Sequence, residues 1–89
     1  MNAFQAKLAR AALDLKFREA AKLCDVAVET IRRIEIADKS IKEKTLDKVR
    51  AAYEKAGVEF IDEDGGGPGV RLRKAKRRAS PGLDKGGRR

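Results

Sequence analysis

Basic side chains crowd the C-terminal end of the sequence, in a pattern that suits the binding of a polyanion. Residues 70–89 hold nine Lys and Arg against one acid, Asp84, whereas residues 1–69 hold 13 basic and 13 acidic residues. The net charge of +8 therefore comes from this end of the chain. We expect a basic arm that binds the phosphates of a nucleic acid without reading sequence, a tail that only improves solubility being the alternative. The basic residues are Arg71, Arg73, Lys74, Lys76, Arg77, Arg78, Lys85, Arg88 and Arg89.

The residue types present give little support for disulfides, metal binding, redox chemistry or catalysis. The chain has one cysteine, Cys24, and no histidine, so we expect neither an internal disulfide nor a zinc site. Cys24 fits a small buried apolar residue better than a redox thiol. The stretch "GGGPG" (65–69) is not followed by Gly-Lys-Ser/Thr, so it predicts a turn and not a phosphate loop. We expect no enzyme, no cofactor and no metal.

The N-terminal stretch lacks the features of a secretory signal. Lys7, Arg10 and Asp14 interrupt its apolar positions, and the sequence has no apolar run of membrane-spanning length. We expect a protein of the cytoplasm, associated with the nucleoid and without membrane contact.

The elements that position the polar residues are predicted to be helical. Apolar residues recur at helical spacing over 3–13, 17–23 and 28–36, and a fourth helix ends at Gly57. The fourth begins near Ser40 if Ser40 and Glu43 form a capping box, or at Lys42. The apolar stripes are Phe4, Leu8, Ala11, Ala12 and Leu15; Ala20, Ala21 and Leu23; Ile31 and Ile34; and Leu46, Val49, Ala52, Tyr53 and Ala56.

A change of period after Gly57 predicts a β-hairpin. Residues 58–61 and 70–73 alternate in polarity, and residues 62–69 between them have turn composition. Residues 74–89 have almost no apolar content and are expected to be a disordered basic tail. The fold class is thus mainly α: a compact four-helix domain over 1–57, a short hairpin over 58–73 and the tail.

The second and third helices predict a helix-turn-helix, because a tight joint separates them and the third has a polar outer side. Ala21 allows close approach of the two helices, Val26 closes the turn, and Asp25 takes the left-handed backbone. In these residues, with "LDL" (13–15), Leu23, "TI" (30–31), "RIE" (33–35) and "TLDKVRAAYEKAGVEF" (45–60), the sequence resembles the Cro/CI-type (XRE family) regulators of bacteria. The segment "DEDGGGPGVRLR" (62–73) is similar to their C-terminal hairpin. The sequence departs from that family at Phe17, commonly Gln, and at Ala27, commonly Ser.

The resemblance implies that the third helix enters the major groove of double-stranded DNA. The implied base-reading residues are Val28, Glu29, Arg32 and Arg33, of which Arg32 is favoured. A solvated helix face with a Glu29–Arg33 pair is the simpler alternative. Glu35 is expected to bond inside the fold. The candidate phosphate contacts, ordinary solubilising residues otherwise, are Lys16, Arg18, Ala27, Thr30, Lys39, Ser40 and Lys42.

The hairpin is the candidate contact for a homodimer on a two-fold operator, through Val58, Phe60, Ile61, Val70 and Leu72, unless it folds back on its own domain. The expected function is therefore that of a transcriptional regulator. An antitoxin or antiactivator that uses the hairpin to bind a protein partner is one alternative. A sequence-indifferent nucleic-acid binder driven by the tail is another.

Overall fold

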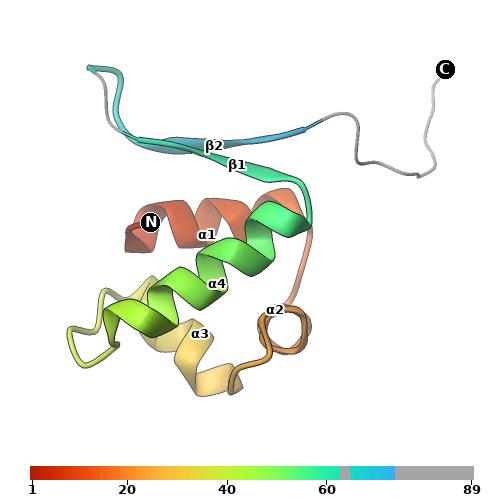
Figure 1. Ribbon diagram of the computed structural model, residues 1–89, viewed down its shortest axis with the longest axis vertical. Coiled ribbons are helices and arrows are strands. Elements are labelled where there is room, and N and C mark those ends of the chain that lie inside the picture. Colours follow the sequence, from red (N-terminus) through yellow and green to blue (C-terminus); the bar gives the residue numbers. More distant parts are fainter. Residues whose placement is uncertain (63–64, 74–89) are drawn as a thin grey trace, which may run out of the picture.

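The computed structural model describes residues 1–62 and 65–73, which form four helices followed by a two-stranded hairpin (Figure 1). The prediction of a mainly α fold with a short β-hairpin is confirmed. The predicted tail, 74–89, lies outside the described residues. The elements are α1 (Ala3–Ala12), α2 (Phe17–Cys24), α3 (Val28–Glu35), α4 (Glu43–Lys55), β1 (Val58–Ile61) and β2 (Gly69–Leu72).

At the start of each of the first two helices, free backbone amides donate hydrogen bonds to side-chain oxygens. Asn2 Oδ1 accepts from the Gln5 amide at 2.8 Å, and Gln5 Oε1 accepts from the Asn2 amide at 3.0 Å, which forms a capping box. Glu19 Oε1 accepts from the Lys16 amide at 2.8 Å at the start of α2. By contrast, the helices α3 and α4 begin after Ala27 and Lys42 without a side-chain cap. Of the two starts considered for the fourth helix, the structure has Lys42.

The other start considered, a Ser40–Glu43 capping box, does not form. The Ser40 amide instead donates to Asp38 Oδ1 at 2.8 Å, so this residue belongs to the turn after α3. Gly57, with φ 110°, follows the end of α4 as predicted.

Each connection between consecutive helices passes through a residue with positive φ that is not glycine: Asp14 (56°), Asp25 (57°) and Ala37 (59°). In each case the next residue donates its amide to a carbonyl five residues back, the bond that defines a Schellman motif. These bonds are Leu15 N to Arg10 O (3.0 Å), Val26 N to Ala21 O (3.0 Å) and Asp38 N to Arg33 O (2.9 Å). The sharp breaks between helices therefore come from one repeated turn.

The core lies between the four helices and the hairpin, and it is made of few large side chains. Tyr53, Ile31, Val49 and Val58 are the largest fully buried residues. Small residues, among them Ala9, Ala20 and Cys24, fill the remaining core positions and let the helices approach closely. Val58 brings the hairpin into the same core as the helices.

The predicted inner side of α1 is wrong. Its buried residues are Gln5, Ala6 and Ala9, whereas Phe4 is 55% exposed and Ala11 is exposed. The side of α1 that faces the core carries Gln5, whose side chain bonds to the hairpin, and two alanines, Ala6 and Ala9, which allow closer helix packing than a phenylalanine would. A similar displacement occurs in α2, where Cys24 is buried and Leu23 is 42% exposed.

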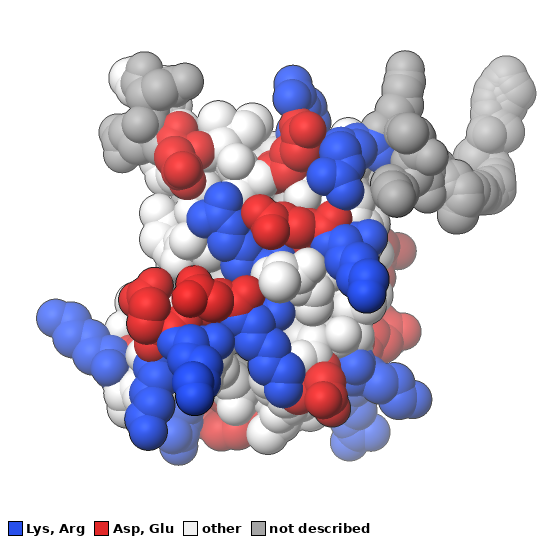
Figure 2. All heavy atoms as spheres, viewed as in Figure 1, with Lys and Arg blue, Asp and Glu red and all other residues white. Residues whose placement is uncertain are grey.

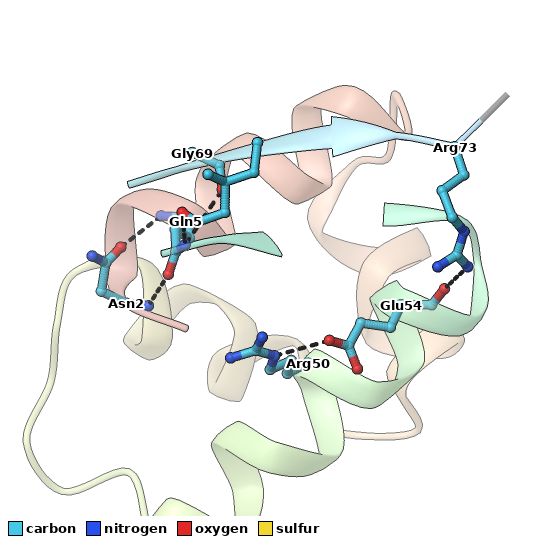
Figure 3. A network of polar contacts seen from close by, with 7 residues as sticks. Asn2, Gln5, Arg50, Glu54, Gly69 and Arg73 are labelled. Carbon is cyan, nitrogen blue, oxygen red and sulfur yellow. Dashed lines mark hydrogen bonds and ion pairs between the residues drawn. The ribbon is translucent and has the colours of Figure 1, made fainter. Parts of the chain in front are cut away.

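The hairpin lies across α1 and against the end of α4 (Figure 1). Its strands are antiparallel, with Val58 opposite Leu72 and Phe60 opposite Val70. Gln5 joins it to α1, because its Nε2 donates to the carbonyls of Ile61 (2.9 Å) and Gly69 (3.3 Å) (Figure 3). This side chain is 3% exposed.

At the other end of the hairpin Arg73 makes the corresponding contact with α4. Its Nη2 donates to the Glu54 carbonyl at 2.8 Å, while the Glu54 carboxylate pairs with Arg50 at 3.0 Å (Figure 3). The hairpin is therefore fixed at one end to α1, far from it in sequence, and at the other end to α4, which directly precedes it.

Candidate nucleic-acid interface

The joint between α2 and α3 has the geometry that the sequence predicts. Asp25 adopts the left-handed conformation (φ 57°, ψ 50°), and Ala21, 4% exposed, lies where the two helices meet. Lys48 of α4, which the sequence reading did not single out, braces this joint. Its Nζ donates to the Asp25 carbonyl at 2.9 Å and lies 3.7 Å from the Asp25 carboxylate.

The outward side of α3 carries most of the residues expected there. Glu29, Arg32 and Arg33 are exposed, whereas Ile31 and Ile34 are buried. The prediction that Val28 faces outward is only partly right, because this residue is half-buried against the core. Ile36, just beyond the helix, was not predicted as a surface residue, yet it is 74% exposed.

The simpler alternative for this face, an ion pair within the helix, is present. Arg33 Nε lies 3.5 Å from Glu29 Oε2 and 3.9 Å from Asp38 Oδ2. The hydrogen bond from the Ser40 amide lowers the pKa of Asp38, so this carboxylate stays charged at neutral pH. Part of the charge of Arg33 and Glu29 is therefore balanced within the protein by exposed ion pairs.

Arg32 is in a different environment. Its guanidinium carbon lies over the Phe17 ring, 4.8 Å from the centroid, and no acidic partner or hydrogen-bond acceptor for it occurs within residues 1–62 and 65–73. Arg10 also lies over this ring, at 4.2 Å. Phe17, which stands where the family commonly has Gln, is thus the aromatic platform for two arginines.

Arg10 itself is held by an ion pair whose carboxylate is buried. Its Nε and Nη2 donate to the two carboxylate oxygens of Glu35 at 2.7 and 2.9 Å, and its Nη1 donates to the Leu15 carbonyl at 3.0 Å. The side chain of Glu35 is 4% exposed and that of Arg10 is 21% exposed. The hydrogen bond to Glu35 raises the pKa of Arg10. Glu35 therefore bonds inside the fold, as predicted, and joins α3 to α1.

The candidate phosphate contacts lie at the two flanks of α3. Lys16 and Arg18 are exposed at the start of α2, and Lys39, Ser40 and Lys42 are exposed in the loop before α4. Figure 1 places α2 and this loop on opposite sides of α3. Ala27, exposed, and Thr30, half-buried, lie on the first turn of α3 itself. The seven residues thus come from the first turn of α3 and from the two segments on either side of it.

The surface charge of the folded part is mixed. Basic and acidic side chains alternate over the face drawn in Figure 2, without one continuous positive field. Long-range attraction of DNA to this face is therefore weak, and contacts there would depend on a few well-placed residues.

The hairpin residues proposed for dimer contact divide into two groups. Val58 is 0% exposed, and Phe60 and Val70 are half-buried against the core, so these three fold back on their own domain. Ile61 and Leu72 remain 37% and 46% exposed. The alternative reading of the hairpin therefore applies to three of its five apolar residues.

A shallow hollow between α2 and α4 is a further surface feature. Its volume is about 370 Å³, and it is lined by Leu23, Cys24, Lys48, Ala51, Ala52, Lys55 and Ala56. Burial raises the pKa of the Cys24 thiol to about 11, so the thiol is protonated at neutral pH and unsuited to redox chemistry. Within the described residues, no cluster of three or more Cys, Asp or Glu side chains could hold a metal ion.

Two further findings bear on the class of protein. No helix in the described part of the chain is long and apolar enough to span a membrane. In comparisons with known proteins, the chain matches no family model and no curated protein.

Proposed function

We propose that this protein is a double-stranded DNA-binding regulator of the Cro/CI type, with α3 as its recognition helix. The observation that carries the proposal is the α2–α3 pair. A tight left-handed turn at Asp25 holds the two helices together, and the outward side of α3 stays unpacked with Arg32 free of acidic partners in the described residues. This is the arrangement by which a helix-turn-helix presents side chains to base edges.

Binding to a two-fold operator requires two copies of the domain. Ile61 and Leu72 are the exposed apolar residues of the hairpin, and the observed register puts them on opposite faces of the ribbon. Leu72, the more exposed of the two, is therefore the apolar residue that supports a homodimer through this element. The two half-sites would then lie about 10 bp apart, centre to centre. The basic run at the C-terminus would add affinity for phosphates without adding sequence preference.

Selection from a random pool of duplex DNA at near-physiological salt tests the proposal. We expect the full chain to enrich an inverted repeat, and we expect a chain ending at Arg73 to enrich the same repeat with lower affinity. Arg32→Ala should abolish or relax the enrichment. Arg50→Ala serves as the matched control, because Arg50 is a partly exposed arginine of α4 that pairs with Glu54.

Enrichment of no sequence by the full chain would refute the proposal. Binding that is lost completely when the chain ends at Arg73 would instead support the sequence-indifferent binder.

The alternative function is an antitoxin or antiactivator that binds another protein. Because most of the apolar hairpin residues pack on their own domain, the hollow between α2 and α4 replaces the hairpin as the docking surface of this alternative. Leu23 gives the hollow an exposed apolar side chain, and Lys48 and Lys55 give it positive charge. This function predicts a stoichiometric complex with a protein partner that Leu23→Glu disrupts, while Arg32→Ala leaves it intact.

A further inference from the structure

The contact between Arg32 and Phe17 orders an arginine without using its hydrogen-bond donors. The guanidinium carbon lies 4.8 Å from the ring centroid, inside the range of a cation–π interaction. An aromatic face takes no N–H donor in a conventional hydrogen bond, and Arg32 donates to no acceptor in the part of the chain that the structure describes. Its donors therefore remain available to a ligand.

Arg33, the next residue, provides an internal comparison. It is engaged by the carboxylates of Glu29 and Asp38 at 3.5 and 3.9 Å. A ligand that uses Arg33 must compete with these acids, whereas a ligand that uses Arg32 competes with none in the described residues. Of the two adjacent cations on α3, Arg32 is the better prepared for an acceptor.

The platform under Arg32 is itself fixed. Phe17 is half-buried at the first position of α2 and lies 4.2 Å from the Arg10 guanidinium. Arg10 is held by two bonds to Glu35 and one to the Leu15 carbonyl. A buried ion pair therefore supports the ring, and the ring supports the exposed arginine.

We propose that Phe17 is a positioning residue that holds Arg32 for a bidentate acceptor on DNA. This inference rests on the proposed function and adds the residue that prepares the recognition helix. Two acceptors share the required chemistry: the O6/N7 edge of guanine and a pair of phosphate oxygens. Holding a long side chain in place before binding avoids an ordering cost that corresponds to about a three- to tenfold change in Kd.

The first test examines the ring contact in the full chain without DNA. In a ¹⁵N NMR spectrum the Arg32 Nε–Hε signal should carry a ring-current shift that Phe17→Leu removes. Phe60→Leu is the matched control, because Phe60 is also half-buried under an arginine, Arg50, at 5.0 Å, but lies in β1. An Arg32 signal unchanged by Phe17→Leu would overturn the proposal.

The second test measures Kd for the selected duplex in a double-mutant cycle. Phe17→Leu should weaken binding about three- to tenfold when it is introduced into the unmodified chain. It should weaken binding by much less when it is introduced into the Arg32→Ala variant. Phe17→Tyr, which retains the ring, should bind nearly as the unmodified chain does. Phe60→Leu should have little effect, and thermal unfolding of each variant identifies losses caused by reduced stability.

The outcomes separate the two claims. If Arg32→Ala weakens binding and Phe17→Leu does not change it, or if the two losses add independently, the positioning role is overturned and the proposed function stands. If the unmodified chain binds no duplex specifically, the proposed function and this role fall together.

Measuring Kd for duplexes with single base changes distinguishes the two possible acceptors of Arg32, guanine and phosphate. Loss of preference at one G·C pair in Arg32→Ala identifies guanine, and a uniform loss with a shallower salt dependence identifies phosphate.

Discussion

The ion pair between Arg10 and Glu35 should be the polar interaction on which stability depends most. In Arg10→Met the Glu35 carboxylate, 4% exposed, would lose both of its guanidinium bonds. Removing one partner of a buried pair typically costs about 3–5 kcal/mol, because the remaining charge is buried without compensation. Since 1 kcal/mol corresponds to about 4–8 °C in a domain of this size, Tm should fall by about 12 °C or more.

Urea titration followed by circular dichroism measures the change in the free energy of unfolding. Arg10→Lys, which keeps the charge but not the paired N–H geometry, should fall between the unmodified chain and Arg10→Met. The double change Arg10→Met with Glu35→Leu should recover much of the loss, because no charge is then left buried. This recovery also covers the case in which Arg10→Met alone does not fold.

The matched control is Glu54→Gln in the Arg50–Glu54 pair of α4, whose side chains are 33% and 43% exposed. A partly exposed pair four residues apart should contribute less than about 0.5 kcal/mol. If Arg10→Met costs no more than Glu54→Gln, the assignment of a structural role to the buried pair is wrong.

Two further predictions concern the backbone and the core. Ala37→Gly should raise the free energy of unfolding by about 0.5–1 kcal/mol, because Ala37 is exposed and has a φ of 59°, which glycine adopts without strain. The control Ala51→Gly, in the helix α4, should lower the free energy of unfolding by about 1 kcal/mol. Urea unfolding midpoints of the two variants measure both changes. An Ala37→Gly chain no more stable than the unmodified one would contradict the assigned backbone conformation. Burial raises the pKa of Cys24 from 9.0 to about 11, so the unfolded chain loses its thiol proton first as the pH rises. The stability from the buried neutral thiol is complete below pH 9.0 and is lost as the pH approaches about 11. The free energy of unfolding should therefore fall less steeply with pH over this range in Cys24→Ala than in the unmodified chain. Equal slopes of unfolding free energy against pH in the two chains would refute the effect.

Local signals predicted most of the fold. The break at Asp25, the end of α4 before Gly57 and the inward bonding of Glu35 all follow from residues near each other in sequence or from simple helical spacing. The hairpin followed from a change of period at Val58. Helix ends differ from the predicted ones by about one residue, which is the usual uncertainty of such boundaries.

The prediction failed where distant segments decide the outcome. Periodicity identified the stripe through Phe4 in α1, but α1 has apolar residues on two sides. The side that faces the core is fixed by Gln5, whose partners Ile61 and Gly69 lie 56 and 64 residues away. A buried polar side chain with partners so remote leaves no local signal.

The candidate site shows the same limit. Spacing placed Glu29, Arg32 and Arg33 outward correctly, but it gave no means to distinguish the arginine engaged by acids from the one over an aromatic ring. That distinction depends on Phe17, 15 residues earlier, and on the way α2 crosses α3. The positions of Phe17 and Arg32 in the sequence predict a contact between them only when the packing of α2 against α3 is already known.

The bonds of Gln5 also determine how the molecule opens. One side chain holds the first turn of α1, through the Asn2 amide, and both strands of the hairpin, through the carbonyls of Ile61 and Gly69. The two ends of the described chain should therefore exchange their amide hydrogens with solvent as one cooperative unit. Such opening would expose the apolar hairpin while α2, α3 and the Asp25 turn between them keep their protection.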